Sequence, residues 1–116
     1  MPTTREHFHE AALTLVGAAP VKQRLAQAFR DHLADLTEPD LPREIRQDFA
    51  SLRSCLTRAK PVIGQGAVEA SVRKLSEGEA AGLAARIIEM YEAVAESAVV
   101  QGSRSPALRA VGSSLD

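Results

Sequence analysis

The strongest structural signal in the chain is a helix start followed by a long helical repeat. Ser76 stands three residues ahead of Glu79, the spacing of a capping box in which each residue binds the other's backbone N–H. The apolar positions that follow recur every three or four residues, and they are Ala80, Leu83, Ala84, Ile87, Ile88, Tyr91, Val94, Ala95 and Ala98. This pattern predicts a helix over residues 77–98, about 33 Å long. Its apolar arc is wide enough to contact two or more other helices, so we expect it to be the central element.

Three weaker patterns of the same kind lie upstream and predict helices over residues 5–16, 21–36 and 43–58. Thr4 is the expected cap of the first helix, and Pro20 and Pro42 suit the starts of the second and third. The expected buried face of the first helix is formed by Phe8, Ala11, Ala12, Leu15 and Val16. The third helix has a narrow apolar seam of Ile45, Phe49, Leu52 and Leu56.

Two further segments complete the predicted fold. Residues 67–75 are ambiguous, because Val68, Val72 and Leu75 suit either a short helix or an extended strand, and we favour the helix. Residues 101–116 are rich in Ser and Gly and are predicted to form a flexible tail. The sequence therefore predicts an all-α fold, a small bundle of four main helices in one domain over residues 1–100.

Composition excludes several classes of protein. The formal charge of −1 argues against a nucleic-acid binder, which usually carries a strong positive excess. The single cysteine, Cys55, permits no internal disulfide, which suits a reducing compartment. The first twenty residues do not resemble a secretion signal, and no stretch approaches the ~20 apolar residues that cross a bilayer. We expect a cytoplasmic protein that does not enter membranes.

Metal and nucleophile signals are weak. Glu6 and His9 have the spacing of half a di-iron motif, but the chain contains no second Glu-x-x-His. His7 and His9 are two residues apart and point away from each other on a helix. Cys55 lies beside the seam of the third helix and is interpreted as an ordinary core residue. We therefore predict no metal, no cofactor and no catalytic residue.

Two features could bind a small ligand. His32 falls in the apolar stripe of the second helix, either as a core-edge residue bonded to a backbone carbonyl or to Asp35, or as a pH-sensing or acid–base group in a pocket. In residues 60–76, glycines precede Arg73, Lys74 and Ser76, which could bind a small anion at the following helix start. The alternative is that this segment is a linker and Ser76 only a cap, because its spacing matches no phosphate-binding motif.

Two rows of charge could bind a protein. The basic row lies beside the seam of the third helix and consists of Arg43, Arg46 and Arg53. The acidic row lies on the outer face of the last helix and consists of Glu89, Glu92 and Glu96. These rows could pair within the bundle or across a dimer, or they could simply be solvated.

The leading hypothesis is a non-enzymatic interaction or regulatory module that forms a homodimer, since two-fold dimers are the commonest soluble oligomers. The alternative is a sensor of small ligands or anions built on His32 and residues 60–76, with weak enzymatic activity.

Overall fold

The described part of the chain is helical throughout its regular structure. The computed structural model describes residues 3–60 and 66–102, and no strand occurs in these ranges. The α-helices are α1 (Thr4–Leu15), α2 (Val21–Ala28), α3 (Arg43–Thr57), α4 (Ala67–Arg73) and α5 (Glu77–Gly102). A π-helical turn, η1 (Phe29–Leu33), continues α2, and a 3₁₀ turn, η2 (Glu38–Asp40), precedes α3. The predicted all-α class is confirmed.

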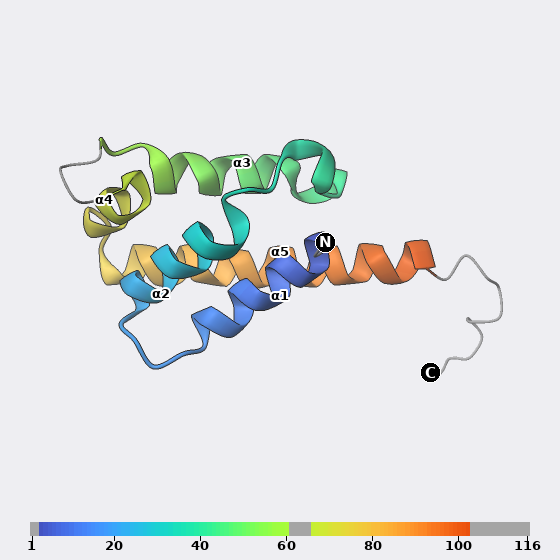
Figure 1. The fold of residues 1–116 in the computed structure, drawn as a ribbon, viewed down its shortest axis with the longest axis horizontal. Coiled ribbons are helices and arrows are strands. Elements are labelled where there is room, and N and C mark those ends of the chain that lie inside the picture. The colour runs from blue at the N-terminus through green and yellow to red at the C-terminus, as the bar shows by residue number, and fades with distance from the viewer. Residues whose placement is uncertain (1–2, 61–65, 103–116) are drawn as a thin grey trace.

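Helix α5 is the central element of the bundle. Helices α1 and α2 pack against it and against each other, and α3 lies along another side of it (Figure 1). The short helix α4 connects the end of α3 to the start of α5 and also packs on α2. Ala80, Ile87 and Val94 of α5 are buried, as the broad apolar arc predicted. Met90 is buried as well, which the predicted arc did not include.

The first helix begins one residue earlier than predicted, because its cap is Thr3 and not Thr4. The backbone N–H of Glu6 donates to Thr3 Oγ1 at 3.1 Å, and the N–H of Thr3 donates to Glu6 Oε1 at 2.8 Å. Only Thr3 stands three residues ahead of Glu6, as this reciprocal cap requires. Thr4 Oγ1 instead donates to the carbonyl of Asp40 at 2.8 Å, which ties the start of α1 to η2.

The second helix does not run regularly to residue 36. Its last turn is widened, and the N–H of Ala34 donates to the carbonyl of Phe29 at 2.9 Å, five residues back. Side chains of other helices bind carbonyls at this end: His7 Nδ1 lies 2.7 Å from the oxygen of His32, and Arg53 donates to the oxygens of Ala34 and Leu36. These tertiary partners allow the helix to end earlier than its apolar pattern suggests.

The remaining predicted elements agree with the structure apart from their ends. The seam of α3 is buried as predicted, and residues 67–73 form the expected short helix. Val16 was expected to be buried and is 73% exposed, because α1 ends at Leu15. Helix α5 continues to Gly102, into the segment predicted as a tail, and residues 103–116 lie outside the described ranges. Among the described helices, none is long and apolar enough to cross a membrane.

Candidate functional site

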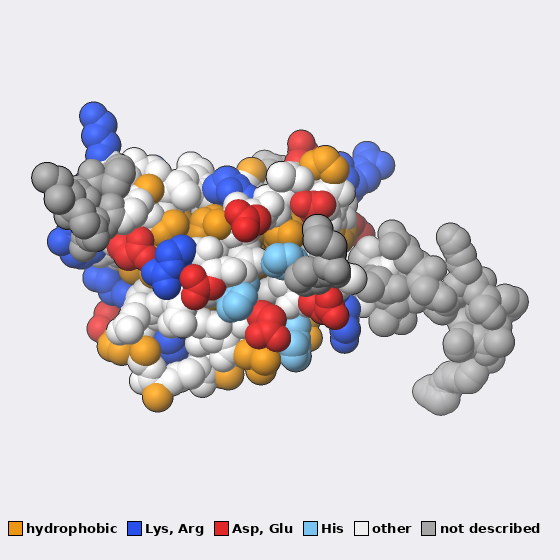
Figure 2. Space-filling model, in the orientation of Figure 1, with side chains coloured by type: hydrophobic (Ala, Val, Ile, Leu, Met, Phe, Trp, Pro, Cys, Tyr) orange, Lys and Arg blue, Asp and Glu red, His pale blue; other side chains and the backbone are white. Residues whose placement is uncertain are grey.

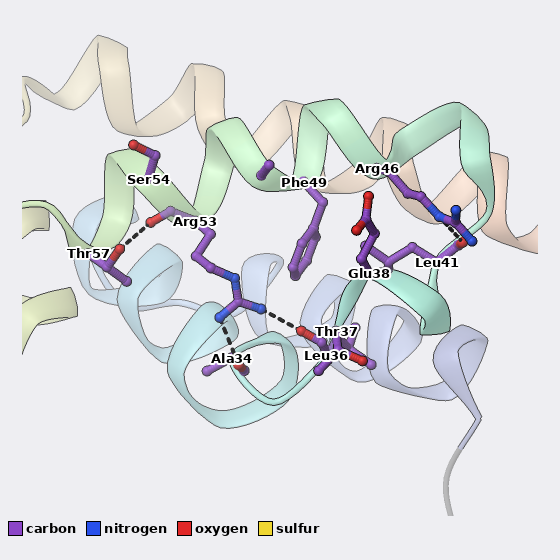
Figure 3. A pocket seen from close by; sticks show the side chains of 11 residues that line it. Ala34, Leu36, Thr37, Glu38, Leu41, Arg46, Phe49, Arg53, Ser54 and Thr57 are labelled. Atoms are coloured by element: carbon purple, nitrogen blue, oxygen red, sulfur yellow. Dashed lines mark hydrogen bonds between the residues drawn. The ribbon is translucent and has the colours of Figure 1, made fainter.

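A groove runs along one side of α3, and the chain segment 34–41 forms its opposite wall (Figure 3). Its volume is about 550 Å³. The residues that α3 contributes share one face of the helix and are Arg46, Phe49, Ala50, Arg53, Ser54 and Thr57. Thr57 lies eleven positions after Arg46, so this wall is about 16 Å long, or three helical turns. The site is an elongated trough and not a closed chamber.

The floor of this groove is apolar. Phe49, Leu36 and Leu41 form the floor, and each is at most 5% exposed. Ala50 and Ser54 lie on the exposed edge of α3, where their small side chains leave the groove open. On the face that Figure 2 views, apolar atoms are scattered among charges of both signs. The groove is therefore open along this edge, and the side chain of Arg53 crosses it between the two walls.

Arg53 holds the two walls of the groove together. Its Nη1 donates to the carbonyl of Ala34 at 3.0 Å and its Nη2 to that of Leu36 at 2.5 Å (Figure 3). Its guanidinium carbon also lies 5.2 Å from the ring centre of Phe49 and 5.7 Å from that of Phe29, within cation–π range. The sequence assigned Arg53 to a basic interaction row, and the structure shows that its donors bind the chain's own backbone.

Arg46 is held by the fold but keeps donors available. Its Nε donates to the carbonyl of Leu41 at 3.0 Å, which fixes the guanidinium at one end of the groove. Among the described residues, none accepts a hydrogen bond from its two terminal nitrogens. Glu38 lines the facing wall, and no ion pair joins its carboxylate to Arg46. Arg46 is therefore a positioned cation that can bind an incoming carboxylate.

A second cavity of about 1040 Å³ continues the groove beyond Arg46 and Leu41, which line both. It is formed by the start of α1, the turn before α3 and the later part of α5, and Arg43 lies on its wall. Two carboxylates that line it are engaged in local caps: Glu6 accepts from the N–H of Thr3, and Asp40 from the N–H and hydroxyl of Thr37. The hydrogen bonds from Thr37 hold the pKa of Asp40 below its usual range.

The acidic and basic rows do not meet within the chain. Glu89 lines a small cavity with Asp48 and Arg86, on the side of the α3 seam opposite the groove. The ion pairs of the described residues both involve Arg30, which binds Asp31 and Glu69. Glu92 and Glu96 are exposed and have no described ionic partner. Pairing of the two rows inside the bundle, one of the expected alternatives, is therefore absent from the described ranges.

His32 lies apart from the groove. Its side chain is half-buried and lines none of the described cavities. The backbone carbonyl of His32, and not its imidazole, forms the hydrogen bond with His7 Nδ1. Because a carbonyl only accepts, His7 Nδ1 must carry the proton of that bond. His9 pairs with the hydroxyl of Tyr91 at 2.8 Å, and the histidines gather on the face shown in Figure 2. In the described ranges, no three His, Cys, Asp or Glu side chains are grouped to hold a metal.

The predicted anion-binding residues are divided between two places. Ser76 caps α5: its Oγ accepts from the N–H of Glu79 at 3.0 Å, and its own N–H donates to Glu79 Oε1 at 2.8 Å. Lys74 is exposed. Arg73 lines a cavity of about 340 Å³ between α2 and α4, which Arg30 also lines and His32 does not. Residues 61–65, part of the predicted loop, lie outside the described ranges.

No family model, curated protein or solved structure matches this chain. The sequence did not predict the second wall of the groove, which residues 34–41 form. The available signal was a leucine on each side of residues 37–40, Leu36 and Leu41, since buried leucines beside a polar turn must pack against a neighbouring element.

Proposed function

We propose that this chain is a non-enzymatic protein-interaction module that binds a segment of a partner in the α3 groove. One observation carries the proposal. The groove combines an apolar floor with a positioned arginine, Arg46, whose terminal nitrogens bind no described residue. A concave site with an apolar floor and a few positioned polar groups is the usual form of a binding site.

The groove offers poor support for catalysis. None of the residues that line it is a histidine or a cysteine. The hydroxyl of Thr57 donates to the carbonyl of Arg53 at 2.6 Å, and that of Thr37 to Asp40. Nucleophilic catalysis requires an activating base beside the nucleophile, and these hydroxyls contact only structural partners. We further propose a cytoplasmic location, because a single cysteine suits a reducing compartment.

The proposal is tested by closing the groove from its exposed edge. Ala50→Arg places a long side chain in the trough at a solvent-exposed helix position, where the fold should tolerate it. Ala81→Arg is the matched control, because Ala81 is exposed on α5 and lines none of the described cavities. The proteins captured from host extract by the three versions are identified, purified and titrated against each version. A partner that binds the wild type and Ala81→Arg but not Ala50→Arg supports the proposal; partners that bind all three equally contradict it.

Self-association is a second candidate, and the unpaired charge rows favour it. Arg43 and Arg46 flank one side of the α3 seam, Glu89 lies toward the other, and Glu92 is exposed one turn further along α5. Two rows on opposite sides favour head-to-tail contact between copies over a closed two-fold dimer. Exposed ion pairs contribute only about 0–1 kcal/mol each, so the association should be weak and sensitive to salt.

Sedimentation velocity tests this candidate with complementary variants. Arg43→Glu with Arg46→Glu should stay monomeric, as should Glu89→Arg with Glu92→Arg, because each loses one of the two faces. A mixture of the two double variants should assemble, because the acidic faces of one variant are complementary to the basic faces of the other. Combining all four changes in one chain restores complementary faces and should restore assembly. A wild type that is strictly monomeric at high micromolar concentration rejects self-association.

A further inference from the structure

We infer that the groove binds an amphipathic α-helix of a partner protein, with acidic residues at the end of that helix that lies beside Arg43 and Arg46. This inference rests on the proposed function and specifies the class of partner. It follows from the shape of the groove, from the lack of a strand edge and of paired aromatic side chains among the described residues, and from its charge.

The shape of the groove suits a helix. Its wall on α3 extends for about three turns, and a partner helix presents apolar residues every three or four positions over that length. Helices pack with their axes about 8–10 Å apart where the side chains between them are small. Ala50 and Ser54 provide such positions at the centre of the exposed edge, above the floor of Phe49 and Leu36.

The groove does not offer the structural features that the other common modes of peptide recognition require. An extended peptide usually adds to the edge of a sheet, and the described ranges contain no strand. Proline-rich peptides bind between aromatic side chains, and Phe49 is the one aromatic residue among those that line the groove. Recognition of a helix by its apolar face requires neither feature.

The charge around the groove sets the direction of the bound helix. Arg46 and Arg43 belong to the first turn of α3, the end at which the helix dipole is positive. The carbonyl of Leu41 holds Arg46 in place, so a carboxylate can bind its terminal nitrogens with little further ordering. Glu38 on the facing wall repels a carboxylate placed on its own side. The acidic residues of the partner must therefore lie against α3.

A peptide library identifies the preferred chemistry without knowledge of the natural partner. Phage displaying random 14-residue peptides are selected on the full chain and counter-selected on Ala50→Arg. The expected consensus has apolar residues at i, i+3 or i+4, and i+7, with Asp or Glu clustered at one end. A synthetic peptide of that consensus is then titrated by fluorescence anisotropy, and its helicity when bound is measured by NMR.

We expect substitutions of Arg46 and Glu38 to change the affinity for this peptide in opposite directions. Arg46→Glu should weaken its binding about tenfold or more, and Arg46→Gln by a smaller factor. Glu38→Gln should strengthen binding, because it removes a repulsive carboxylate. Ala81→Arg should leave the affinity unchanged. Thermal melts of each variant establish that the fold is retained, and Arg46→Gln serves as the test if Arg46→Glu does not fold.

The failures of the two proposals are distinguishable. A basic, extended or unpatterned consensus, or an affinity unchanged in both Arg46 variants, overturns the inference but leaves a groove that binds peptides. Displacement of the selected peptide by a synthetic copy of residues 103–116 would identify the chain itself as the occupant and would also overturn it. If no selected peptide distinguishes the wild type from Ala50→Arg, both the inference and the proposed function fail.

Discussion

Replacing Arg53 with alanine tests whether this residue stabilises the fold by joining α3 to the end of η1. The substitution removes the donors to the carbonyls of Ala34 and Leu36 and the contacts with the rings of Phe29 and Phe49. A hydrogen bond from a charged donor contributes about 1.5–3 kcal/mol net. Because Arg53 is only half-buried, water can partly replace it at these carbonyls, and the lower value applies to each bond.

We expect Arg53→Ala to lower the free energy of unfolding by about 3 kcal/mol from the two hydrogen bonds, with up to about 1 kcal/mol more from the lost cation–π contacts. For a domain of this size, each kcal/mol corresponds to about 4–8 °C in Tm, so Tm should fall by more than about 12 °C. Arg53→Lys keeps the charge but lacks the planar fork that reaches both carbonyls, and it should lose about half as much.

The assay is urea unfolding followed by circular dichroism, with thermal melts as a second measurement. Arg43→Ala is the matched control, because Arg43 is exposed on the same helix and makes no described hydrogen bond, so its loss should cost under about 0.5 kcal/mol. If Arg53→Ala costs no more than this control, or if Arg53→Lys equals the wild type, Arg53 does not join the two elements and the groove wall is held by other contacts.

Three further predictions concern the core, a helix cap and acid stability. Phe49→Ala should cost about 3–5 kcal/mol in urea unfolding, since Phe49 is 3% exposed, and a loss under about 1 kcal/mol would contradict its place in the core. Ser76→Ala should cost about 1 kcal/mol and speed amide exchange in the first turn of α5; unchanged exchange there would argue against the cap. The hydrogen bond from Arg30 lowers the pKa of Glu69 from its ordinary value of 4.5. The ion pair therefore stabilises the fold above that ordinary pKa, and this stabilisation is lost as the pH falls through the lower pKa of Glu69 in the folded state. The stability difference between the wild type and Glu69→Gln should therefore shrink between pH 7 and pH 3, and a constant difference would refute this coupling.

The sequence alone determined which segments form helices and which residues form most of the core. Helix formation depends on residues three and four positions apart, so the cap at Ser76 and the seam of α3 could be read from local spacing. The cap of α1 was predicted one residue too late, because Thr3 and Thr4 are both suitable capping residues. Only the three-residue spacing from Thr3 to Glu6 distinguishes them.

Only the tertiary structure decided where α2 ends, what Arg53 does and that a groove exists. The carbonyl of His32 is bound by a side chain 25 residues away, and that of Leu36 by one 17 residues away. Sequence periodicity carries no information about such partners. The groove likewise arises where residues 34–41 pack beside α3, and each segment alone presents only one wall. Local patterns specify helices because backbone hydrogen bonds close within one turn, whereas a binding site depends on which surfaces meet after the chain has folded.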